Sequence, residues 1–372
     1  MLIKDLNSLK RFFKKIKRPI LGAGVYAFNR LGPEEFVSNY QILSLYSSKE
    51  IELIKGDIPV FCLEEKVKNR LRPRNSSTLI SHPETQEYIS KFQDPLILFY
   101  QSSGRIEEAA SQHKFKTGIS PYRFGKQFFE DKIKFREILQ EIHISPTPGR
   151  VFPFSSLMSL QFSQIGEEFG LPFVLQHPKR GGGEGTFFIK DEDDFRKSKE
   201  SLYENPTEEI IVAKFIDGLS PSVTGCVTRY GILSTRPQYQ ICDVPILYSR
   251  PTCSGLFCGH DWSASEFSPN ILLQAQEIIG KIGNYFRKLG YLGVFGIDFV
   301  EDRKEEKLYV TECNPRLLGS MPVLTMTEIE NDIPPIVAFH ILEYLEIPYE
   351  IDVKRILQLL WRKREGAQMI LY

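Results

Sequence analysis

Hydrophobic and polar positions alternate most regularly near the end of the chain. Two apolar, β-branched and aromatic runs, Gly293–Val300 and Lys307–Asn314, flank a charged stretch at residues 301–306. Runs of this kind favour strands, and a short solvated stretch between them favours a turn. The pattern predicts a β-hairpin whose turn is centred near Lys304 or Glu305.

This hairpin would bring oxygen-bearing side chains together. Side chains two residues apart in a strand point to the same face, so Glu312 and Asn314 share one face of the second strand. The expected turn places Asp298 opposite Glu312, with Arg316 just beyond. Two carboxylates and an amide oxygen suit Mg²⁺ carrying a nucleotide's phosphates better than zinc or a redox metal. The alternative is an ordinary hairpin whose acids face water.

The first third of the chain alternates short apolar runs (residues 42–46, 60–63 and 96–100) with polar or helical stretches. Such alternation predicts a small open parallel sheet. Gly22 and Gly24 lack the further glycine and the acidic residue of a dinucleotide-binding turn, and we interpret them as a tight loop. Beyond residue 120 the periodicity predicts helices over 128–142, 156–169 and 271–289, and strands over 171–176, 186–190 and 210–216.

A glycine-rich segment, residues 180–186, lies between two of these strands. Glycine allows backbone N–H groups to approach an anion closely and to adopt positive φ, which suits a flap over phosphates. A mobile linker is the equal alternative. Lys132 upstream and Lys179 beside the glycines could supply cations, although a solvated surface position is the usual fate of lysine.

Composition excludes several classes of function. Of 372 residues, 42% are apolar and 25% are charged, and 47 basic residues balance 47 acidic ones. Charge therefore gives no reason to expect a nucleic-acid partner, and no apolar run approaches the ~20 residues of a membrane span. Residues 1–18 form a basic amphipathic stripe; a helix docked on its own domain is favoured over contact with a membrane surface.

Six cysteines show no paired framework. Cys253, Cys258 and His260 fit no common zinc module, and reduced thiols in a cytoplasmic protein are the better explanation. No Ser/His/Asp or Cys/His arrangement is detectable from spacing, so a nucleophile-based hydrolase has no support.

Taken in order, these segments resemble the ATP-grasp superfamily. The resemblance covers about residues 120–320 and is carried by Asp131-Lys132 before a helix, the glycine flap, Val-Ala-Lys-Phe-Ile-Asp-Gly, Gly-x-Asp298-Phe and Glu312-Cys-Asn314-Pro-Arg316. It implies a mixed α/β fold with three parts: a pre-ATP-grasp open parallel α/β domain (1–120), a small lid subdomain with the flap (121–215) and a larger antiparallel-sheet subdomain with the Mg/ATP site (216–372).

The resemblance also implies a role for individual residues. Lys132 and Arg316 would act in catalysis, and Asp298, Glu312 and Asn314 would hold Mg²⁺, for which Mn²⁺ can substitute. ATP would be bound by Lys132, Gln176, Lys179, Gly181, Gly182, Gly183, Gly185, Thr186, Lys214, Phe215 and Ile216. Among the last three, the backbone groups of Lys214 and Ile216 would form hydrogen bonds with adenine.

Three positions depart from the family pattern. Gln176 stands where lysine is usual, which weakens one phosphate contact or moves it to Lys179. Ala213 stands where an acidic adenine contact is common, and Asp298 replaces a frequent glutamate. These departures put turnover, rather than the metal site, in doubt.

The implied reaction joins a carboxylic acid to an amine. Phosphorylation of the acid by ATP gives an acyl phosphate with a good leaving group, which the amine displaces. The acid would be an amino acid or a small peptide-like acid, by family analogy alone, with Arg236 and Arg250 as candidate carboxylate clamps. Carboxylase-like or formate-dependent chemistry, and a nucleotide-binding protein without turnover, are the alternatives. A homo-oligomer is left open.

Overall fold

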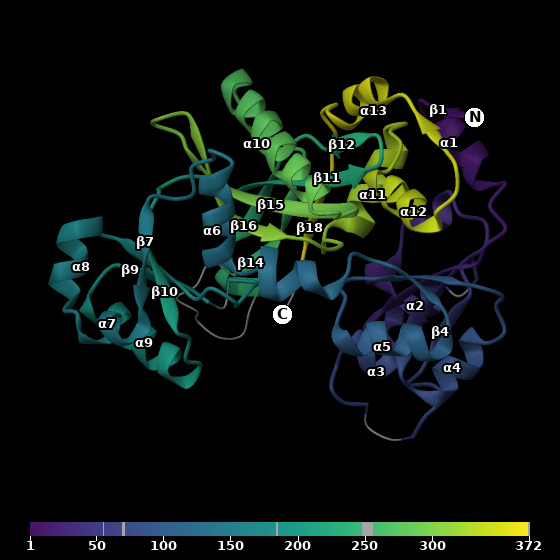
Figure 1. The fold of residues 1–372 in the computed structure, drawn as a ribbon, viewed down its shortest axis with the longest axis horizontal. Helices are drawn as coiled ribbons and strands as arrows, with labels where there is room; N and C mark the ends of the chain where they lie inside the picture. The colour runs from purple at the N-terminus through teal and green to yellow at the C-terminus, as the bar shows by residue number, and fades with distance from the viewer. Residues whose placement is uncertain (55, 69–70, 184, 248–255, 371–372) are drawn as a thin grey trace.

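The computed structural model describes residues 1–372 apart from 55, 69–70, 184, 248–255 and 371–372. Three larger sheets lie in the described part of the chain, and Figure 1 shows them in three regions of the molecule. The seven-stranded sheet lies in the middle, between a smaller body on the left and the N-terminal sheet on the right. This mixed α/β architecture confirms the predicted fold class.

The N-terminal sheet has five parallel strands in the order β4-β3-β2-β5-β6. Its strands are β2 (Ile20–Gly24), β3 (Tyr40–Ser44), β4 (Val60–Cys62), β5 (Leu96–Phe99) and β6 (Lys116–Gly118), and its helices are α2 (Lys49–Ile54), α3 (Ser76–Ile80), α4 (Pro83–Ile89) and α5 (Gly104–His113). The open parallel sheet expected from the alternation is confirmed. The tight loop expected at Gly22 and Gly24 is wrong, because both glycines belong to the central strand β2.

The lid is a four-stranded antiparallel sheet in the order β7-β10-β8-β9. Its elements are β7 (Gly149–Pro153), α7 (Phe154–Ser159), α8 (Phe162–Phe169), β8 (Phe173–Gln176), β9 (Thr186–Ile189), α9 (Glu192–Glu204) and β10 (Glu209–Lys214). One helix was predicted over 156–169, but the structure has two. Leu160 is extended, and Gln161 starts α8 by a capping box with Gln164.

The seven-stranded sheet has the order β16-β15-β11-β13-β14-β18, with β12 beside β11. Its strands are β11 (Pro221–Thr228), β12 (Gly231–Ser234), β13 (Gln238–Cys242), β14 (Phe257–Asp261), β15 (Gly293–Asp302), β16 (Lys307–Asn314) and β18 (Ala367–Met369). One face packs on α6 (Lys132–Glu141) and α10 (Pro269–Lys288), and together they bury an apolar core. Asp131 caps α6, so this helix starts four residues later than predicted.

The C-terminal helices α11 (Met321–Glu330), α12 (Ile336–Leu345) and α13 (Val353–Leu360) lie beside the N-terminus (Figure 1). Strand β1 (Leu2–Ile3) pairs with β17 (Glu350–Ile351), and helix α1 (Leu6–Phe13) follows it. The N-terminal sheet, α1 and the C-terminal helices share one apolar core. The predicted domain boundaries near residues 120 and 215 remain a prediction.

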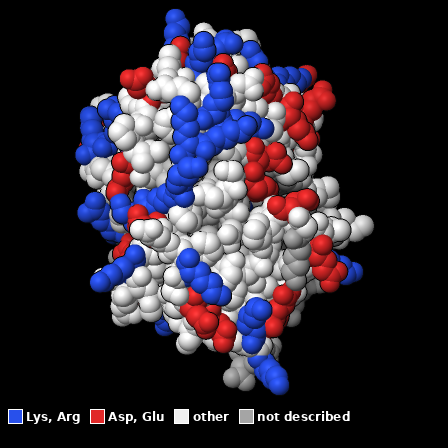
Figure 2. Space-filling view, turned by 90° about the vertical axis from the view of Figure 1, so that its right-hand side faces the viewer, with Lys and Arg blue, Asp and Glu red and all other residues white. Residues whose placement is uncertain are grey.

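Helix α1 docks on its own chain, as predicted. Leu6, Leu9 and Phe13 are buried in the shared core, so its apolar stripe does not face a membrane surface. Figure 2 shows Lys and Arg side chains gathered over the upper part of the face where Figure 1 places the N-terminus. Across the described residues, no helix has both the length and the apolar character needed to cross a bilayer.

Candidate functional site

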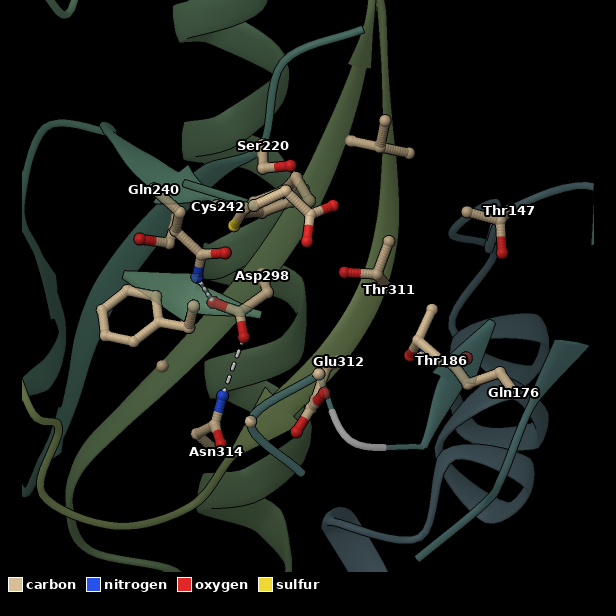
Figure 3. Close-up of a pocket in the computed structure, with 18 of the residues that line it drawn as sticks. Thr147, Gln176, Thr186, Ser220, Gln240, Cys242, Asp298, Thr311, Glu312 and Asn314 are labelled. Carbon is tan, nitrogen blue, oxygen red and sulfur yellow. Dashed lines mark hydrogen bonds between the residues drawn. The ribbon is translucent and has the colours of Figure 1, made fainter. Parts of the chain in front are cut away.

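A cleft of about 730 Å³ separates the lid from the seven-stranded sheet. Figure 3 shows Gln176 and Thr186 of the lid across the cleft from the hairpin β15–β16. Predicted site residues that line it are Gln176, Gly182, Gly183, Thr186, Lys214, Phe215, Ile216, Asp298, Glu312, Asn314 and Arg316. Segments that are far apart in the sequence therefore meet at one cavity.

The hairpin forms where predicted, and a β-bulge between Asp298 and Phe299 shifts the register by one residue at the site. Asp298 on β15 is the partner of Glu312 on β16, and the turn spans residues 303–306. Cys313, between Glu312 and Asn314, is buried in the core on the opposite face. Because Asp298 and Glu312 line the cleft, the alternative of a hairpin with its acids in open water is wrong.

Asp298 is held by two amide groups. Its Oδ1 accepts a hydrogen bond from Gln240 Nε2 at 2.6 Å, and its Oδ2 accepts one from Asn314 Nδ2 at 2.9 Å (Figure 3). Burial, reinforced by the charge of Glu312, raises the pKa of Asp298 to about 7. Two neighbouring carboxylates in a partly dehydrated position attract a divalent cation, since it relieves both the burial and the repulsion.

Asn314 is oriented differently from the prediction. Its Oδ1 accepts a hydrogen bond from Arg316 Nη2 at 2.6 Å, so its nitrogen, not its oxygen, faces Asp298. The three oxygens therefore do not converge on one point in this structure. The carboxylates of Asp298 and Glu312 fit Mg²⁺ by charge and donor type, and Asn314 would join them only with its amide turned over.

Lys132 links α6 to both walls of the cleft. Its side chain is only 3% exposed, its Nζ donates to the Arg180 carbonyl at 2.5 Å, and it lies 3.3 Å from Glu312 Oε2. The alternative of a solvated helix lysine is therefore wrong. Lys132 does not itself line the cleft, but it fixes the flap next to the Glu312 carboxylate.

The glycine flap adopts the backbone expected of it. Gly182 and Gly183 have φ of 68° and 88°, and the Thr186 amide donates to the Gly183 carbonyl at 3.0 Å. A Cβ on Gly181 would lie 3.8 Å from Glu312 Oε1, so the flap backbone passes beside the hairpin. Gly181 and Gly185 do not line the cleft, and Glu184 lies outside the described residues.

Lys179 and Gln176, two further lid residues expected to contact phosphate, lie in different surroundings. The Lys179 side chain is 62% exposed and 3.9 Å from Asp131, and it does not line the cleft. The structure therefore gives no support to a phosphate contact moved from Gln176 to Lys179. Gln176 faces the cleft and donates weakly to Thr186 Oγ1 at 3.4 Å.

The segment expected to read adenine borders the cleft at the end of β10. Lys214, Phe215 and Ile216 all line it, as does Ala213. The Lys214 amide already donates to the Pro148 carbonyl at 2.8 Å. The backbone role of Lys214 and Ile216 stays a prediction.

Arg316 joins the hairpin to the N-terminal sheet. Its Nε lies 3.0 Å from Glu130 Oε1, and its Nη1 donates to the hydroxyl of Tyr100, the residue after β5. Glu130, Glu312 and the Tyr100 hydroxyl raise the pKa of Arg316 against the opposing effect of burial. The guanidinium therefore stays charged at the edge of the cleft, as a cation that faces a reacting phosphoryl group must.

Sequence reasoning missed Gln240, Tyr100 and Lys190, which all line the cleft. The alternation Gln238-Tyr239-Gln240 is a strand signal that could have placed Gln240 on the face of Asp298. Tyr100 carries no such signal, because only the packing of two domains brings it to Arg316.

Of the other sequence candidates, His260 also lines the cleft. Arg236 does not line the cleft; its amide donates to the Leu360 carbonyl at 3.2 Å. Arg250 and Cys253 lie outside the described residues. Cys258 and His260 are buried on β14, and burial lowers the pKa of His260 to about 4. In the described ranges, no three His, Cys, Asp or Glu side chains form a group that could hold a metal.

Solved structures share this architecture. A biotin carboxylase from Campylobacter jejuni superimposes with a TM-score of 0.64 at 16% identity, over 94% of this chain and 74% of its own. An N5-carboxyaminoimidazole synthetase from Staphylococcus aureus, complexed with ADP, gives 0.59 at 15% identity, over 96% and 94%. At these identities the likeness concerns the fold alone.

Sequence comparison points the same way. The arginine-specific large chain of carbamoyl phosphate synthase from Halalkalibacterium halodurans is 22% identical over 199 residues, 53% of this chain. The match spans only 17% of that protein's length. Residues 129–320, just over half of the 372, match the ATP-grasp domain family. The chain belongs to the ATP-grasp family.

Proposed function

We propose that this protein is an ATP- and Mg²⁺-dependent ligase that joins a carboxylate to an amine. An oxygen of the acid attacks the γ-phosphorus of ATP, ADP leaves, and an acyl phosphate forms. The amine then attacks the acyl carbon, inorganic phosphate leaves with the C–O bonding electrons, and the nitrogen loses a proton. The acid would be an amino acid or a small peptide-like acid.

The observation that supports this best is the pairing of Asp298 with Glu312 across a cleft from a glycine flap. Bound Mg²⁺ would supply charge neutralisation on the transferring phosphates. Asp298 and Glu312 would hold that ion, with Gln240 keeping Asp298 in place through their 2.6 Å hydrogen bond. A site fixed in advance avoids reorganisation during the reaction.

The chain's cations have separate roles in this proposal. Arg316 would face the reacting groups from the edge of the cleft, where Glu130 and Tyr100 hold its side chain. Lys132 would hold the flap close to Glu312 through its contacts with the Arg180 carbonyl and the Glu312 carboxylate. The flap itself would exclude water, which would otherwise hydrolyse the acyl phosphate.

The test is ADP and phosphate release by the full chain supplied with MgATP and pairs of amino acids. We expect release only when an acid and an amine are both present, and none without Mg²⁺. Glu312→Gln should abolish it. If the protein binds nucleotide but releases no ADP with any pair of amino acids, it is a nucleotide-binding protein without turnover. Gln176 and Ala213, which depart from the family pattern, are the reason to consider this alternative.

A second candidate is carboxylation, with bicarbonate as the acid. The similar structures include a biotin carboxylase domain crystallised with MgADP and bicarbonate, from Hydrogenobacter thermophilus, at a TM-score of 0.62 and 14% identity. ADP release that requires bicarbonate and an acceptor, but no amino acid, would favour this candidate over the first.

A further inference from the structure

Arg30 is a buried cation without a counter-ion. It lies in a short 3₁₀ turn, Phe28–Arg30, that follows β2, and only 5% of the residue is exposed. Among the described residues, its guanidinium has no hydrogen-bond acceptor or ion-pair partner, and its Nε is buried and unpaired. Buried charges in proteins are normally paired, because dehydrating an unpaired one is costly.

The surroundings of Arg30 are built to accommodate it. A Cβ on Gly24 would lie 3.1 Å from the Arg30 Nε, and one on Gly22 would lie 3.1 Å from its Cβ. Gly24 therefore leaves room for the arginine at the carboxyl end of β2, whereas a Cβ on Gly22 would first meet the Tyr40 hydroxyl, at 1.9 Å. The carboxyl end of an open parallel sheet is where ligands usually bind.

Among the described residues, no acid offsets the charge of Arg30. Burial lowers its pKa, and only the hydroxyl groups of Tyr40 and Tyr100 act against this. Glu34, four residues away, uses its Oε2 to accept a hydrogen bond from the Gly32 amide at 2.7 Å. Arg30 therefore lacks a counter-ion, and an anion from outside the described chain would supply it.

Tyr100 connects Arg30 to the cleft. The guanidinium carbon of Arg30 lies 5.8 Å from the centre of the Tyr100 ring, and that of Arg316 lies 4.6 Å from it. Tyr100 and Arg316 both line the cleft. The two arginines therefore lie against one ring, with Arg316 on the side of the metal-binding hairpin.

A second buried polar group lies at the start of α11. The Leu317 amide donates to the Tyr100 carbonyl at 3.1 Å, and three residues later the hydroxyl of Ser320 is fully buried without a partner. Ser320 precedes α11, which packs against the Arg30 turn. Leu318 and Gly319, just before it, line the cleft.

We propose that Arg30 binds an oxyanion of the acid substrate other than the carboxylate that reacts, with Ser320 as an additional donor. This inference rests on the proposed ligase function and narrows its substrate to small acids that carry a second anionic group. The planar guanidinium can donate two parallel hydrogen bonds to a carboxylate or to a phosphate. The reacting carboxylate lies at Arg316, and the second anion lies beyond Tyr100.

The test measures thermal unfolding of the full chain saturated with MgADP, titrated in separate arms with glutarate and with inorganic phosphate. We expect at least one anion to raise the Tm of the natural protein. In Arg30→Gln, the apparent affinity of the protein for that anion should fall about tenfold or more, because a charged hydrogen bond is lost. Arg30→Lys should retain part of the effect. Arg105→Gln, which removes an exposed arginine of α5, should retain all of it.

The measured outcomes decide the inference. A Tm that responds to neither anion, or that responds equally in Arg30→Gln and the natural protein, would overturn it. Without added anion, Arg30→Gln should have an unchanged or higher Tm, since it removes an uncompensated buried charge. A lower Tm with unaltered anion response would mean that Arg30 is structural. MgADP binding separates the two proposals: failure of the natural protein to bind it contradicts the ligase function, whereas normal binding with Arg30-independent anion effects contradicts this inference alone.

Discussion

The two walls of the cleft are held in different ways. On the hairpin wall, Asp298, Asn314 and Arg316 form a continuous chain of hydrogen bonds that reaches Gln240 on one side and Tyr100 on the other. On the lid wall, Gly182 and Gly183 have positive φ, and a Cβ on Gly182 would meet nothing within 4 Å. The hairpin wall is fixed by side-chain contacts, and the flap has open space at Gly182 but not at Gly185, where a Cβ would lie 2.5 Å from the Arg180 Cβ.

This difference matches the two tasks of the proposed site. Metal and phosphate ligands must be in place before the reaction, so they gain from a rigid network. A flap must admit the nucleotide and then cover it, so it gains from few contacts. Within the described part of the chain, Lys132 contacts both the Arg180 carbonyl and Glu312 and so connects the two walls.

Glu312→Gln should have the largest effect. It removes a carboxylate from the rigid wall, so ATP turnover should fall at least about 100-fold. Because Glu312 is not a core residue, the free energy of unfolding should change by no more than about 1–2 kcal/mol. Asn314→Ala should act in the same direction. Steady-state ADP release and denaturant unfolding measure the two quantities, with Glu305→Gln in the exposed turn as the control. Normal rates in Glu312→Gln would contradict the metal assignment.

Lys132→Met tests the connection between the walls. It removes the contact to Glu312 and the anchor of the flap, so the affinity for MgATP should fall about 10- to 100-fold. Lys179→Met, on an exposed lysine nearby, should change it less than about twofold. Calorimetric titration with MgATP measures both. A larger loss in Lys179→Met than in Lys132→Met would show that the exposed flap lysine matters more for MgATP binding than the buried one.

Gly182→Ala tests the lid wall. Alanine fits the space but is disfavoured at φ 68° by about 1 kcal/mol, so closure of the flap should weaken and the KM for ATP should rise about fivefold. The Tm should hardly change. Gly280→Ala on α10, a helical glycine with free space around it, is the control and should leave the KM unaltered. An unchanged KM in Gly182→Ala would mean that this glycine has no part in closure.

Gln176→Lys should have the smallest effect, and in the opposite direction. It restores a cation on the lid wall facing the cleft, so MgATP should bind about fivefold more tightly. Gln140→Lys, which adds the same charge at an exposed position of α6, controls for net charge. If neither variant binds more tightly, the glutamine is not the reason for any weakness in nucleotide binding.

Local patterns predicted much of the site. The alternation around the charged turn predicted that Asp298 and Glu312 lie roughly opposite each other, because strand periodicity and turn position determine which side chains face each other. It did not predict the β-bulge between Asp298 and Phe299, which completes the pairing. The parallel N-terminal sheet followed from its alternation of strands and helices. The same reasoning failed at Leu160, where a capping box divides one predicted helix into two, and at Gly22, where glycines belong to a strand.

The periodicity of the sequence could not predict contacts between distant segments. The hairpin, the glycine flap and the family could be recognised from the residues alone, since each is encoded within a short run of the chain. The fold, in contrast, buries Lys132 against Glu312, leaves Lys179 in solvent, and brings Arg30 and Arg316 to Tyr100. Those outcomes depend on how three sheets pack together, which no local spacing of side chains specifies.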